Sequence, residues 1–368
     1  MGIFLFLLNR EEKKHEYKKI LVSKDTHYDR YFFNGCRREL YLIEAEQGKL
    51  QREVSAATTD KTMVIPGGMP IGIYLETNGV MVLGTDAIEG IDGEKHNPSE
   101  HLVKAGDYIT EVNGEAINTK NELIQKIEKL SNDDVILTLH RNQDSIKVKT
   151  KAVSCEKDKY KLGIWVRDNT QGLGTVTYLD ANSRFGALGH GIHDVDTSKL
   201  LEIEGGTVYT TSVKDIQKGK TGTPGGMEGI IVYNNYNILG KITKNTEAGI
   251  FGTIQRIDTL FSDQTPVEAA GKEEIKEGPA TILCAAEGKV KEYKIEIEKV
   301  DIHSKEINKG IILRVTDERL LEVTGGIVQG MSGSPILQDG KLVGAVTHVF
   351  VNDPTRGYGI FIENMLGN

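Results

Sequence analysis

The sequence has few cysteines, and they form no recognisable pattern. Only three occur in 368 residues, Cys36, Cys155 and Cys284, and they lie far apart. Three cysteines allow at most one intramolecular disulfide, and no CxxC spacing indicates a metal site. The chain is therefore not a small disulfide-stapled domain, and we expect neither a metal ion nor an organic cofactor.

Long hydrophobic runs are also lacking. The apolar run at the start, Ile3 to Leu8, has six residues. A membrane span needs about 20 apolar residues, and the core of a signal peptide needs about 7–15. This run is either the remnant of a longer export segment or a short strand at a frayed end. We assign residues 1–61 to an N-terminal segment that includes this remnant and a linker.

Charge of one sign does not accumulate anywhere in the chain. The 45 basic and 53 acidic residues are mixed along it, giving a net charge of −8. Proteins that bind nucleic acid usually carry a basic arm or stripe. We therefore expect no nucleic-acid partner.

Glycine, by contrast, is abundant. The chain has 41 glycines and only 8 prolines, so glycine makes up about 11% of residues against a usual ~7%. Over residues 160–368, short apolar runs such as "GTVTYL" and "GIIVYNNYNILGKI" alternate with glycine turns. Regularly spaced strands without long helices predict a sandwich or a closed barrel. The fold class is mainly β.

A separate domain is predicted over residues 62–153. The segment "AGDYITEVNGEAI" reads as two strands joined by a tight Asn113-Gly114 turn. A helix should follow, capped by Asn118 or Thr119. Its apolar residues recur at helical spacing: Leu123, Ile124, Ile127 and Leu130.

This segment resembles a PDZ domain. The resemblance rests on Ile71, Gly72 and Ile73, which match the apolar-Gly-apolar loop of that family, and on "AGDYITEVNGEAI". It implies that an extended peptide adds to an open strand edge, with backbone N–H groups of the loop holding a carboxylate. The ligand would be a partner's tail or this protein's own N-terminal segment.

The strongest candidate for chemistry is "GMSGSP", residues 330–335. It resembles the Gly-x-Ser-Gly-Gly-Pro motif of trypsin-like proteases, and Ser332 aligns with their nucleophile. Glycines let backbone N–H groups converge on one point, so those of Gly330 and Ser332 are the candidate oxyanion hole. Ser334 stands where the motif has glycine and is a second candidate. A purely structural turn is the third interpretation.

A serine nucleophile needs a base, and His190 is the best candidate. It lies in "FGALGHGIHDVDT", between two glycines and 142 residues before Ser332. The glycines indicate a close approach to another part of the fold. His193 is the competitor, but no HExxH motif supports reading the pair as half of a metal site.

The third member of such a site is a carboxylate that orients the imidazole. The residues alone leave the β domain with several candidates: Asp180, Asp194, Asp196, Asp301 and Asp317. Asp317 ends an apolar strand only 15 residues before Ser332. It could instead cap the turn "TDERL", in which case Asp194 or Asp180 would orient the base.

The motifs "GALGHGIHD", "GKTGTPGGMEG" and "GMSGSP", followed by "DPTRGYGIFIENML", are similar to the stage IV B sporulation serine peptidases. That family implies a PDZ domain followed by a trypsin-like double β-barrel. It also implies a His–Asp–Ser triad, carried here by His190, Asp317 and Ser332.

The resemblance further implies a role in signalling between compartments during sporulation. Such a peptidase is made in the forespore and exported to the space between the forespore membranes. It cleaves itself near the N-terminus and cleaves a regulator of a membrane-embedded metalloprotease, which activates a late mother-cell sigma factor.

The family begins with a membrane-spanning or signal segment, of which this chain shows only "IFLFLL". Membrane association through a missing or divergent N-terminus is therefore expected from the resemblance alone. The alternative function is a non-catalytic PDZ and β-barrel scaffold that gates a membrane protein complex.

Overall fold

The computed structural model describes residues 61–130, 134–142, 144–157, 159–261 and 264–368. The predicted N-terminal segment, including Ile3 to Leu8, lies outside these residues. In the part of the chain that is described, no helix is long and apolar enough to cross a bilayer.

The first of two barrels is a closed ring of six antiparallel strands. Each strand pairs with the next, and the last pairs back with the first, in the order β2 (Pro70–Thr85), β11 (Ile164–Leu179), β12 (Arg184–Ala187), β16 (Gly249–Ile254), β15 (Ile238–Thr246) and β13 (Ile203–Gln217). Alternate residues point inward and form a core that includes Ile73, Leu75, Phe185 and Val208.

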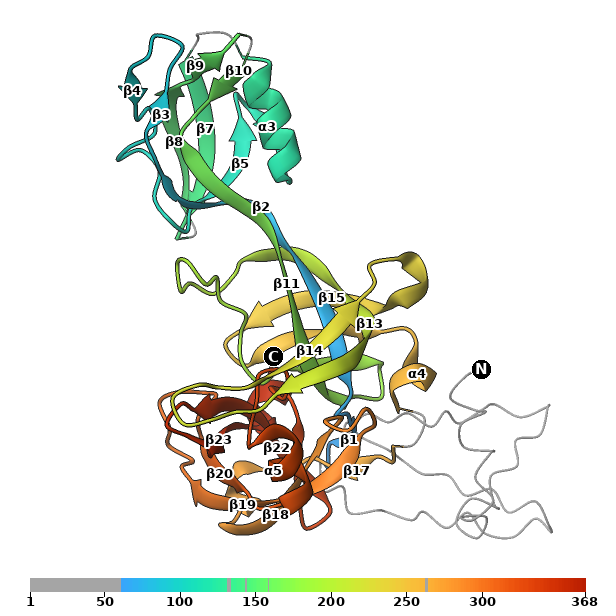
Figure 1. Ribbon diagram of the computed structural model, residues 1–368. Coiled ribbons are helices and arrows are strands. Elements are labelled where there is room, and N and C mark those ends of the chain that lie inside the picture. Colours follow the sequence, from blue (N-terminus) through green and yellow to red (C-terminus); the bar gives the residue numbers. More distant parts are fainter. Residues whose placement is uncertain (1–60, 131–133, 143, 158, 262–263) are drawn as a thin grey trace, which may run out of the picture. The chain divides into compact units, whose positions relative to one another are not determined.

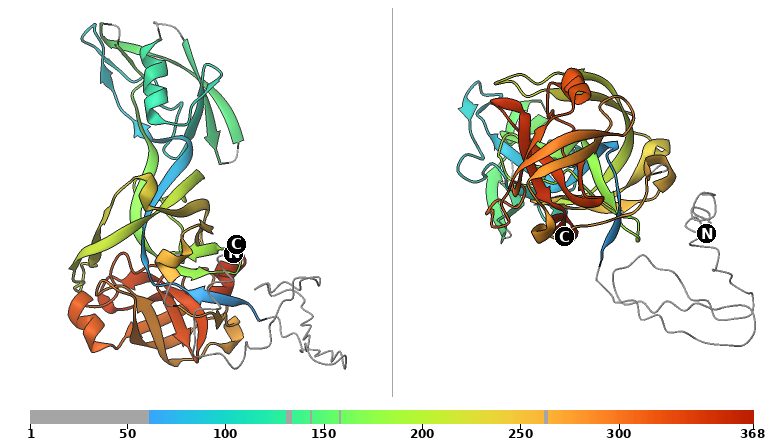
Figure 2. Two further views of the ribbon diagram at one scale, coloured as in Figure 1. Left: turned by 90° about the vertical axis from the view of Figure 1, so that its right-hand side faces the viewer. Right: turned by 90° about the horizontal axis from the view of Figure 1, so that it is seen from below.

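The second barrel is also closed and has six strands. Their order is β18 (Gly278–Cys284), β19 (Lys291–Val300), β20 (Ile311–Val315), β23 (Asp353–Phe361), β22 (Lys341–Phe350) and β21 (Pro335–Gln338). Tyr293, Leu313, Ile336 and Val346 fill its interior. The two barrels confirm the predicted mainly β class, and Figures 1 and 2 show the strands of the second in orange and red.

A PDZ domain is inserted into the first barrel rather than placed before it. Its strands and helix are the second half of β2, β3 (Ile88–Glu89), β4 (Lys95–His96), β5 (Tyr108–Val112), β6 (Glu115–Ala116), α3 (Lys120–Glu128), β7 (Asp134–Arg141), β8 (Asp144–Lys151), β9 (Val153–Glu156), β10 (Lys159–Lys161) and the first half of β11. Figure 1 shows β2 and β11 running side by side through this insertion. Thr119 caps α3 in a capping box with Glu122, as the sequence predicted.

The predicted boundaries of 62–153 are therefore wrong at both ends. At the start, β1 (Met63–Pro66) pairs with Tyr178 and Leu179 of β11, so it extends the barrel sheet. At the other end, Ile164 and Val166 still pack against the PDZ core. The insertion begins and ends within two continuous strands, which leave no linker for a sequence pattern to reveal.

The assignment of Ile71, Gly72 and Ile73 to the peptide-binding loop is wrong as well. These residues lie in the barrel half of β2, where Ile71 pairs with Gly174 on one side and Thr210 on the other. Both isoleucines are fully buried. A Cβ on Gly72 would lie 2.8 Å from the side chain of Ile231, so glycine is needed here for packing.

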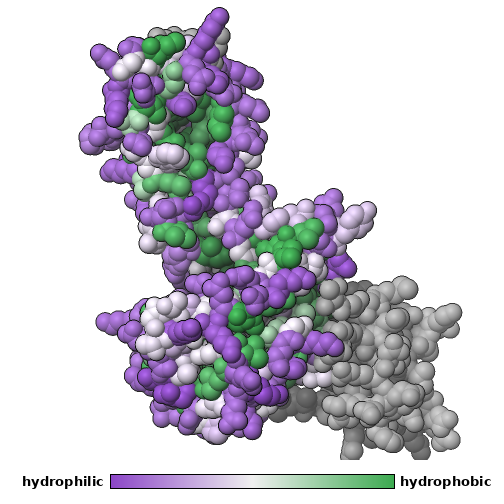
Figure 3. All heavy atoms as spheres, viewed as in Figure 1, coloured by the Kyte–Doolittle hydropathy of each residue, from purple (hydrophilic) through white to green (hydrophobic). Residues whose placement is uncertain are grey.

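The remaining elements are short and cover the barrels: β14 (Gly226–Ile231), η2 (Asn235–Asn237), α4 (Ile257–Phe261), β17 (Val267–Glu268), η3 (Lys272–Glu274), α5 (Glu318–Thr324) and α6 (Ile362–Leu366). Strand β14 pairs with β13 and forms a hairpin with it. Figure 3 shows apolar residues in small separate groups on a mainly hydrophilic face.

Replacing Ile71 by alanine tests the barrel position of β2. We expect Ile71→Ala to lower the free energy of unfolding by about 2–5 kcal/mol, because it leaves a cavity in a closed core. The matched control is Ile124→Ala on α3, whose side chain is 43% exposed and which should change stability by less than about 0.5 kcal/mol. Calorimetric unfolding measures both, and equal effects would contradict the assignment.

Candidate active site

The serine segment has a backbone that only glycine adopts readily. Gly330 and Gly333 have φ angles of 97° and 95°, which place them in a region that L side chains rarely occupy. A Cβ on Gly333 would lie 2.1 Å from the carbonyl oxygen of Thr175. These glycines therefore hold Ser332 in a sharp bend against β11.

Strand β11 fixes the direction of the carbonyl groups in this bend. The hydroxyl of Thr175 donates to the carbonyl oxygen of Gly330 at 2.7 Å. The backbone N–H of Thr175 donates to the carbonyl oxygen of Ser332 at 3.0 Å. The hydroxyl of Thr177 donates to the carbonyl oxygen of Gly333 at 2.8 Å. Three carbonyls of the bend are thus held by two threonines of the first barrel.

The N–H groups of the bend are used selectively. Those of Met331, Gly333 and Ser334 donate to backbone carbonyls. Among the hydrogen bonds of the described residues, none is donated by the N–H of Gly330 or of Ser332. An oxyanion hole requires two backbone donors beside the nucleophile that are not paired within the fold. The N–H groups of Gly330 and of Ser332 itself are two such donors. The assignment of this hole to Gly330 and Ser332 stays a prediction, and the geometry is compatible with it.

The two serines of the motif differ in access. Ser332 is partly exposed, and its hydroxyl donates to the carbonyl oxygen of Thr347 on β22 at 2.7 Å. Ser334 is 0% exposed, and its hydroxyl has no partner within the described residues. A peptide carbonyl cannot reach a fully buried hydroxyl, so the structure favours Ser332 as the nucleophile.

His190 lies just after β12, in a loop that passes close to both barrels. A Cβ on Gly189 would lie 2.8 Å from Ile360 of the second barrel, and one on Gly191 would lie 2.7 Å from the carbonyl oxygen of Thr246. The two glycines that flank the histidine are thus needed for this close approach, as the sequence suggested.

The His190 ring is held in one tautomer. Its Nδ1 lies 2.9 Å from the carbonyl oxygen of Gly191. Because a carbonyl only accepts, Nδ1 carries the proton and Nε2 keeps its lone pair. Burial lowers the pKa of this imidazole below its usual range. His190 is therefore neutral near pH 7 and suited to accept a proton at Nε2.

Ser332 and the His190 loop both contact neighbouring residues of β22. The Thr347 carbonyl accepts the serine hydroxyl, and the Thr347 methyl would lie 3.0 Å from a Cβ on Gly189. The next residue, His348, places its ring 4.8 Å from that of His190, centroid to centroid. Burial lowers the pKa of His348 to about 4, so this second ring is neutral too. No hydrogen bond joins Ser332 to His190 among the described residues, so attack requires the serine hydroxyl to rotate away from Thr347.

Asp317 is not brought to His190, contrary to the prediction. It is the N-cap of α5, and its carboxylate accepts from the backbone N–H groups of Arg319 and Leu320. It also accepts from the Lys294 N–H at 3.2 Å and pairs with the Arg319 guanidinium at 2.8 Å. The hydrogen bond from Arg319 contributes most to lowering its pKa to about 2. The capping alternative for "TDERL" is the one that the structure shows.

The other aspartates considered from sequence are also engaged elsewhere. Asp194 and Asp196 pair with Arg167, and Asp180 pairs with Arg184. Asp301 lies 3.8 Å from the Lys299 ammonium. None of these carboxylates is hydrogen-bonded to His190 in the part of the chain that the structure describes.

Comparison with known proteins decides the family. The family model for SpoIVB peptidase S55 matches residues 158–366, more than half of the chain. The chain belongs to the SpoIVB peptidase S55 family. The S55 match covers the serine motif, the histidine loop and all of the second barrel. This chain is therefore a serine peptidase of sporulation.

Solved structures show more remote likenesses. A PDZ domain of an SdrC-like protein from Listeria monocytogenes matches at 24% identity over 24% of this S55 chain and 87% of that chain, with a TM-score of 0.20. The inactive form of the Rv3671c protease of M. tuberculosis matches at 13% identity over 53% and 81%, with a TM-score of 0.30. Its active form matches at 13% identity over 54% and 72%, with a TM-score of 0.29. No curated protein matches the chain.

The PDZ domain of this S55 peptidase contains a second apolar-Gly-apolar sequence, which the sequence analysis missed. Leu162, Gly163 and Ile164 lead into the first half of β11, and Gly163 has a φ of 65°. Residues 164–168 pair only with β2 among the described strands, so their other edge is open. Helix α3 packs beside β10 and β11. An open strand edge beside a helix is the arrangement expected of a peptide groove.

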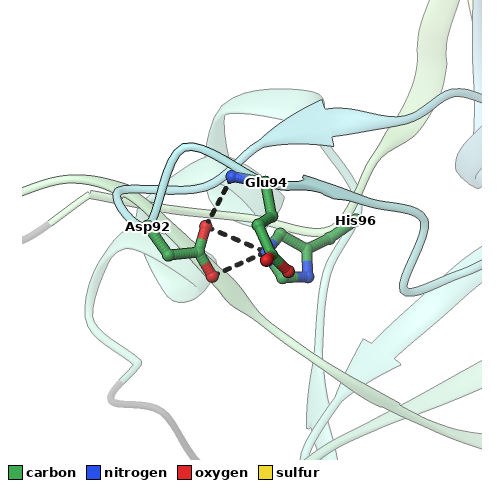
Figure 4. A group of neighbouring side chains, drawn as sticks. All are labelled: Asp92, Glu94 and His96. Carbon is green, nitrogen blue, oxygen red and sulfur yellow. Dashed lines mark hydrogen bonds and ion pairs between the residues drawn. The ribbon is translucent and has the colours of Figure 1, made fainter.

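A further cluster lies on the β3–β4 hairpin of the S55 peptidase (Figure 4). One ligand atom from each of Asp92, Glu94 and His96 lies within 4.8 Å of the others. The Asp92 carboxylate already accepts from the His96 ring and from the Glu94 N–H. Both carboxylates are exposed. The contacts are those of an exposed ion pair in a turn, and none involves the serine or histidine of the site.

Asp317→Asn tests whether this residue stabilises the fold of the S55 peptidase. Its folded-state pKa of about 2 lies below the value of 3.8 for a free aspartate. The ionised carboxylate therefore contributes stability above about pH 4, and this contribution is lost as pH falls toward 2. It amounts to about 2 kcal/mol.

We expect Asp317→Asn to lower the melting temperature at pH 7 and to differ less from wild type at pH 3. Thermal unfolding at the two pH values measures this. Glu318→Gln, at the neighbouring position of α5, is the control. An unchanged melting temperature at pH 7 would contradict the capping role.

Proposed function

We propose that this peptidase cleaves peptide bonds with Ser332 as nucleophile and His190 as general base. The Ser332 oxygen attacks the carbonyl carbon of the scissile bond while its proton passes to Nε2 of His190. The backbone N–H groups of Gly330 and Ser332 stabilise the oxyanion that forms. His190 then donates its proton to the leaving amine, and water releases the acyl group by the same route in reverse.

One observation carries this proposal: Ser332, the one serine of the motif that is partly exposed, lies beside two backbone N–H groups that donate to no group of the described residues. The carbonyls of the same bend are held back by Thr175 and Thr177. Gly330 and Ser332 are both partly exposed, so the carbonyl oxygen of a bound peptide can reach these two N–H groups. An oxyanion hole needs that arrangement before substrate arrives.

Membership of the S55 family is the basis on which we also propose the compartment, the substrate and the signalling role of this peptidase. The peptidase is exported from the forespore to the space between its membranes, cleaves itself near its N-terminus, and cleaves a regulator of a membrane-embedded metalloprotease. This cleavage leads to activation of a late mother-cell sigma factor. The open strand edge in the PDZ domain supports a protein substrate or partner, because it offers backbone groups to an extended chain.

A fluorophosphonate probe tests the catalytic assignment without knowledge of the substrate. We expect the wild-type chain to be labelled at Ser332, because a base-activated serine attacks phosphorus and displaces fluoride. Ser332→Ala should abolish labelling and leave the melting temperature unchanged. Ser334→Ala is the matched control and should still be labelled. Labelling that survives in Ser332→Ala and disappears in Ser334→Ala would reassign the nucleophile. No labelling of folded wild-type protein would favour the scaffold alternative.

We further propose that the PDZ ligand is an extended peptide that adds to the open edge at residues 164–168. Trp165 lies on this edge, is 63% exposed and is the single tryptophan of the chain. Its fluorescence therefore reports directly on this surface.

Titration with synthetic peptides should shift the Trp165 emission to shorter wavelength in a saturable way, because an added strand removes water from the indole. Peptides ending in a free carboxylate and their amidated forms show whether the Leu162–Ile164 loop holds a carboxylate. Residues 40–60 of this chain serve as an internal candidate ligand. Gly163→Val is the negative control, since a Cβ there would lie 2.5 Å from the Asp86 carbonyl oxygen. Saturable shifts of equal size in the wild-type protein and in Gly163→Val would show that the peptide does not bind at the Leu162–Ile164 loop.

A further inference from the structure

The loop between β13 and β14 extends from the first barrel to the second. It carries the motif "GKTGTPGGMEG", residues 219–229, which includes neither the serine nor the histidine of the site. The N–H of Gly219 donates to the carbonyl oxygen of Thr324, the last residue of α5, at 2.9 Å. The N–H of Gly222 donates to the carbonyl oxygen of Val351, just after β22, at 2.8 Å. The loop is therefore attached at two places to the half of the chain that carries Ser332.

A third attachment lies directly before the candidate oxyanion hole. The N–H of Gln329 donates to the carbonyl oxygen of Gly225 at 2.9 Å, and the carbonyl oxygen of Gln329 accepts from the N–H of Met227 at 2.8 Å. The Met227 side chain packs against the core of the second barrel, and a Cβ on Gly330 would lie 3.1 Å from its Cβ. The loop thus holds both backbone groups of the residue that precedes Gly330.

The hydrogen bond from Met227 determines which way the Gly330 N–H points. The carbonyl of Gln329 and the N–H of Gly330 belong to one planar trans peptide, so they point in opposite directions. Because the carbonyl is directed at Met227, the N–H is directed away from the loop. There it donates to no group of the described residues. The peptide on the other side of Gly330 is held separately, by the Thr175 hydroxyl.

Gly330 does not select this orientation by itself. Its φ is 97°, and glycine adopts positive and negative φ about equally well. Turning the peptide between Gln329 and Gly330 over would make this φ negative. It would also place the Gln329 carbonyl oxygen where the Gly330 N–H now points. A carbonyl oxygen there would repel the oxyanion that the N–H stabilises.

We propose that the segment Gly225–Met227 positions the oxyanion hole, with the Met227 N–H as the group that keeps the Gly330 N–H directed at the substrate. This inference rests on the proposed function and deepens it. The first barrel then orients a donor of the second barrel in addition to supplying the base. Displacement of the loop removes one oxyanion donor and leaves the serine and the histidine in place.

The rate at which a fluorophosphonate labels Ser332 at pH 7 tests this role. In that reaction the Oγ–P bond forms, the P–F bond breaks with loss of fluoride, and the proton goes to His190. Negative charge develops on the phosphoryl oxygen, so the rate depends on the oxyanion hole. Met227→Pro removes the N–H, whereas the matched control Met227→Ala keeps it.

We expect Met227→Pro to slow labelling about ten- to a hundredfold, because losing an oxyanion donor outright costs about 10²–10³ in rate. Met227→Ala should be labelled at close to the wild-type rate.

A second reaction separates positioning of the hole from general damage to the site. Iodoacetamide alkylates the thiol of Ser332→Cys at a saturated carbon: the S–C bond forms, iodide leaves, and the thiol proton goes to His190. No oxyanion forms in this step. Adding Met227→Pro to Ser332→Cys should therefore leave the alkylation rate within about twofold. Peptide mapping distinguishes this thiol from the native cysteines. Slowing of both reactions to the same extent would overturn the inference.

Gly225→Ala provides a second variant if Met227→Pro does not fold. A Cβ on Gly225 would lie 2.2 Å from the Gln217 carbonyl oxygen, so the loop must shift, whereas one on Gly222 would meet nothing within 4 Å. Gly225→Ala should slow labelling, and the control Gly222→Ala should not. Labelling within about twofold of wild type in folded Met227→Pro or in Gly225→Ala would overturn the inference, while labelling of wild-type Ser332 keeps the proposed function. Wild-type protein that is not labelled overturns both.

Discussion

The antiparallel pairing of β2 with β11 is the interaction on which the rest of the structure depends. At one end it closes the first barrel, with Ile71 opposite Gly174. At the other end it joins the PDZ domain to that barrel, with Ile164 opposite Thr85. Next to Gly174, at the barrel end of the ladder, lies Thr175, which orients the carbonyls of Gly330 and Ser332 in the serine bend. The first barrel, the open edge of the PDZ domain and the serine bend therefore all depend on this one pair of strands.

Both barrels contribute residues to the candidate active site. The second barrel provides the serine and the β22 residues around it, while the first provides the histidine loop and the two threonines. Most of the polar contacts there are made by backbone groups held in place by glycine. Such groups are positioned by strand pairing itself, so they need little reorganisation when charge develops. This explains why glycines flank both the serine and the histidine.

Much of this could be predicted from sequence because the signals were local. Alternating strands, the Asn113-Gly114 turn, the capped helix and the glycine-framed Ser332 and His190 each occupy a short stretch. The place of β2 could not be predicted, because its partners β11 and β13 are remote in sequence and an apolar-Gly-apolar pattern suits either a barrel strand or a peptide loop. The true open edge carries the same pattern at Leu162–Ile164.

Asp317 shows why the role of a single residue is hard to predict from its local sequence. An aspartate after a strand and before "ERL" suits an N-cap as well as a catalytic acid, and only the positions of Arg319 and Lys294 distinguish the two roles. The turn between β15 and β16 contacts the histidine loop through Asn245, and the two lie together only after the first barrel has closed.

The insertion within β2 and β11 also has a consequence for how the chain folds. Pro70 and Thr175 pair although about 100 residues separate them, and closing so long a loop costs conformational entropy. The inserted domain is built mostly from contacts close in sequence, such as β7 with β8 and β5 with β7. Local contacts form faster than distant ones. Once these local contacts have formed, β2 and β11 leave the inserted domain next to each other. The loop that must still close to pair their barrel halves is then only a few residues long. We therefore expect the inserted domain to form before the first barrel closes, because it brings the two strands of that barrel together.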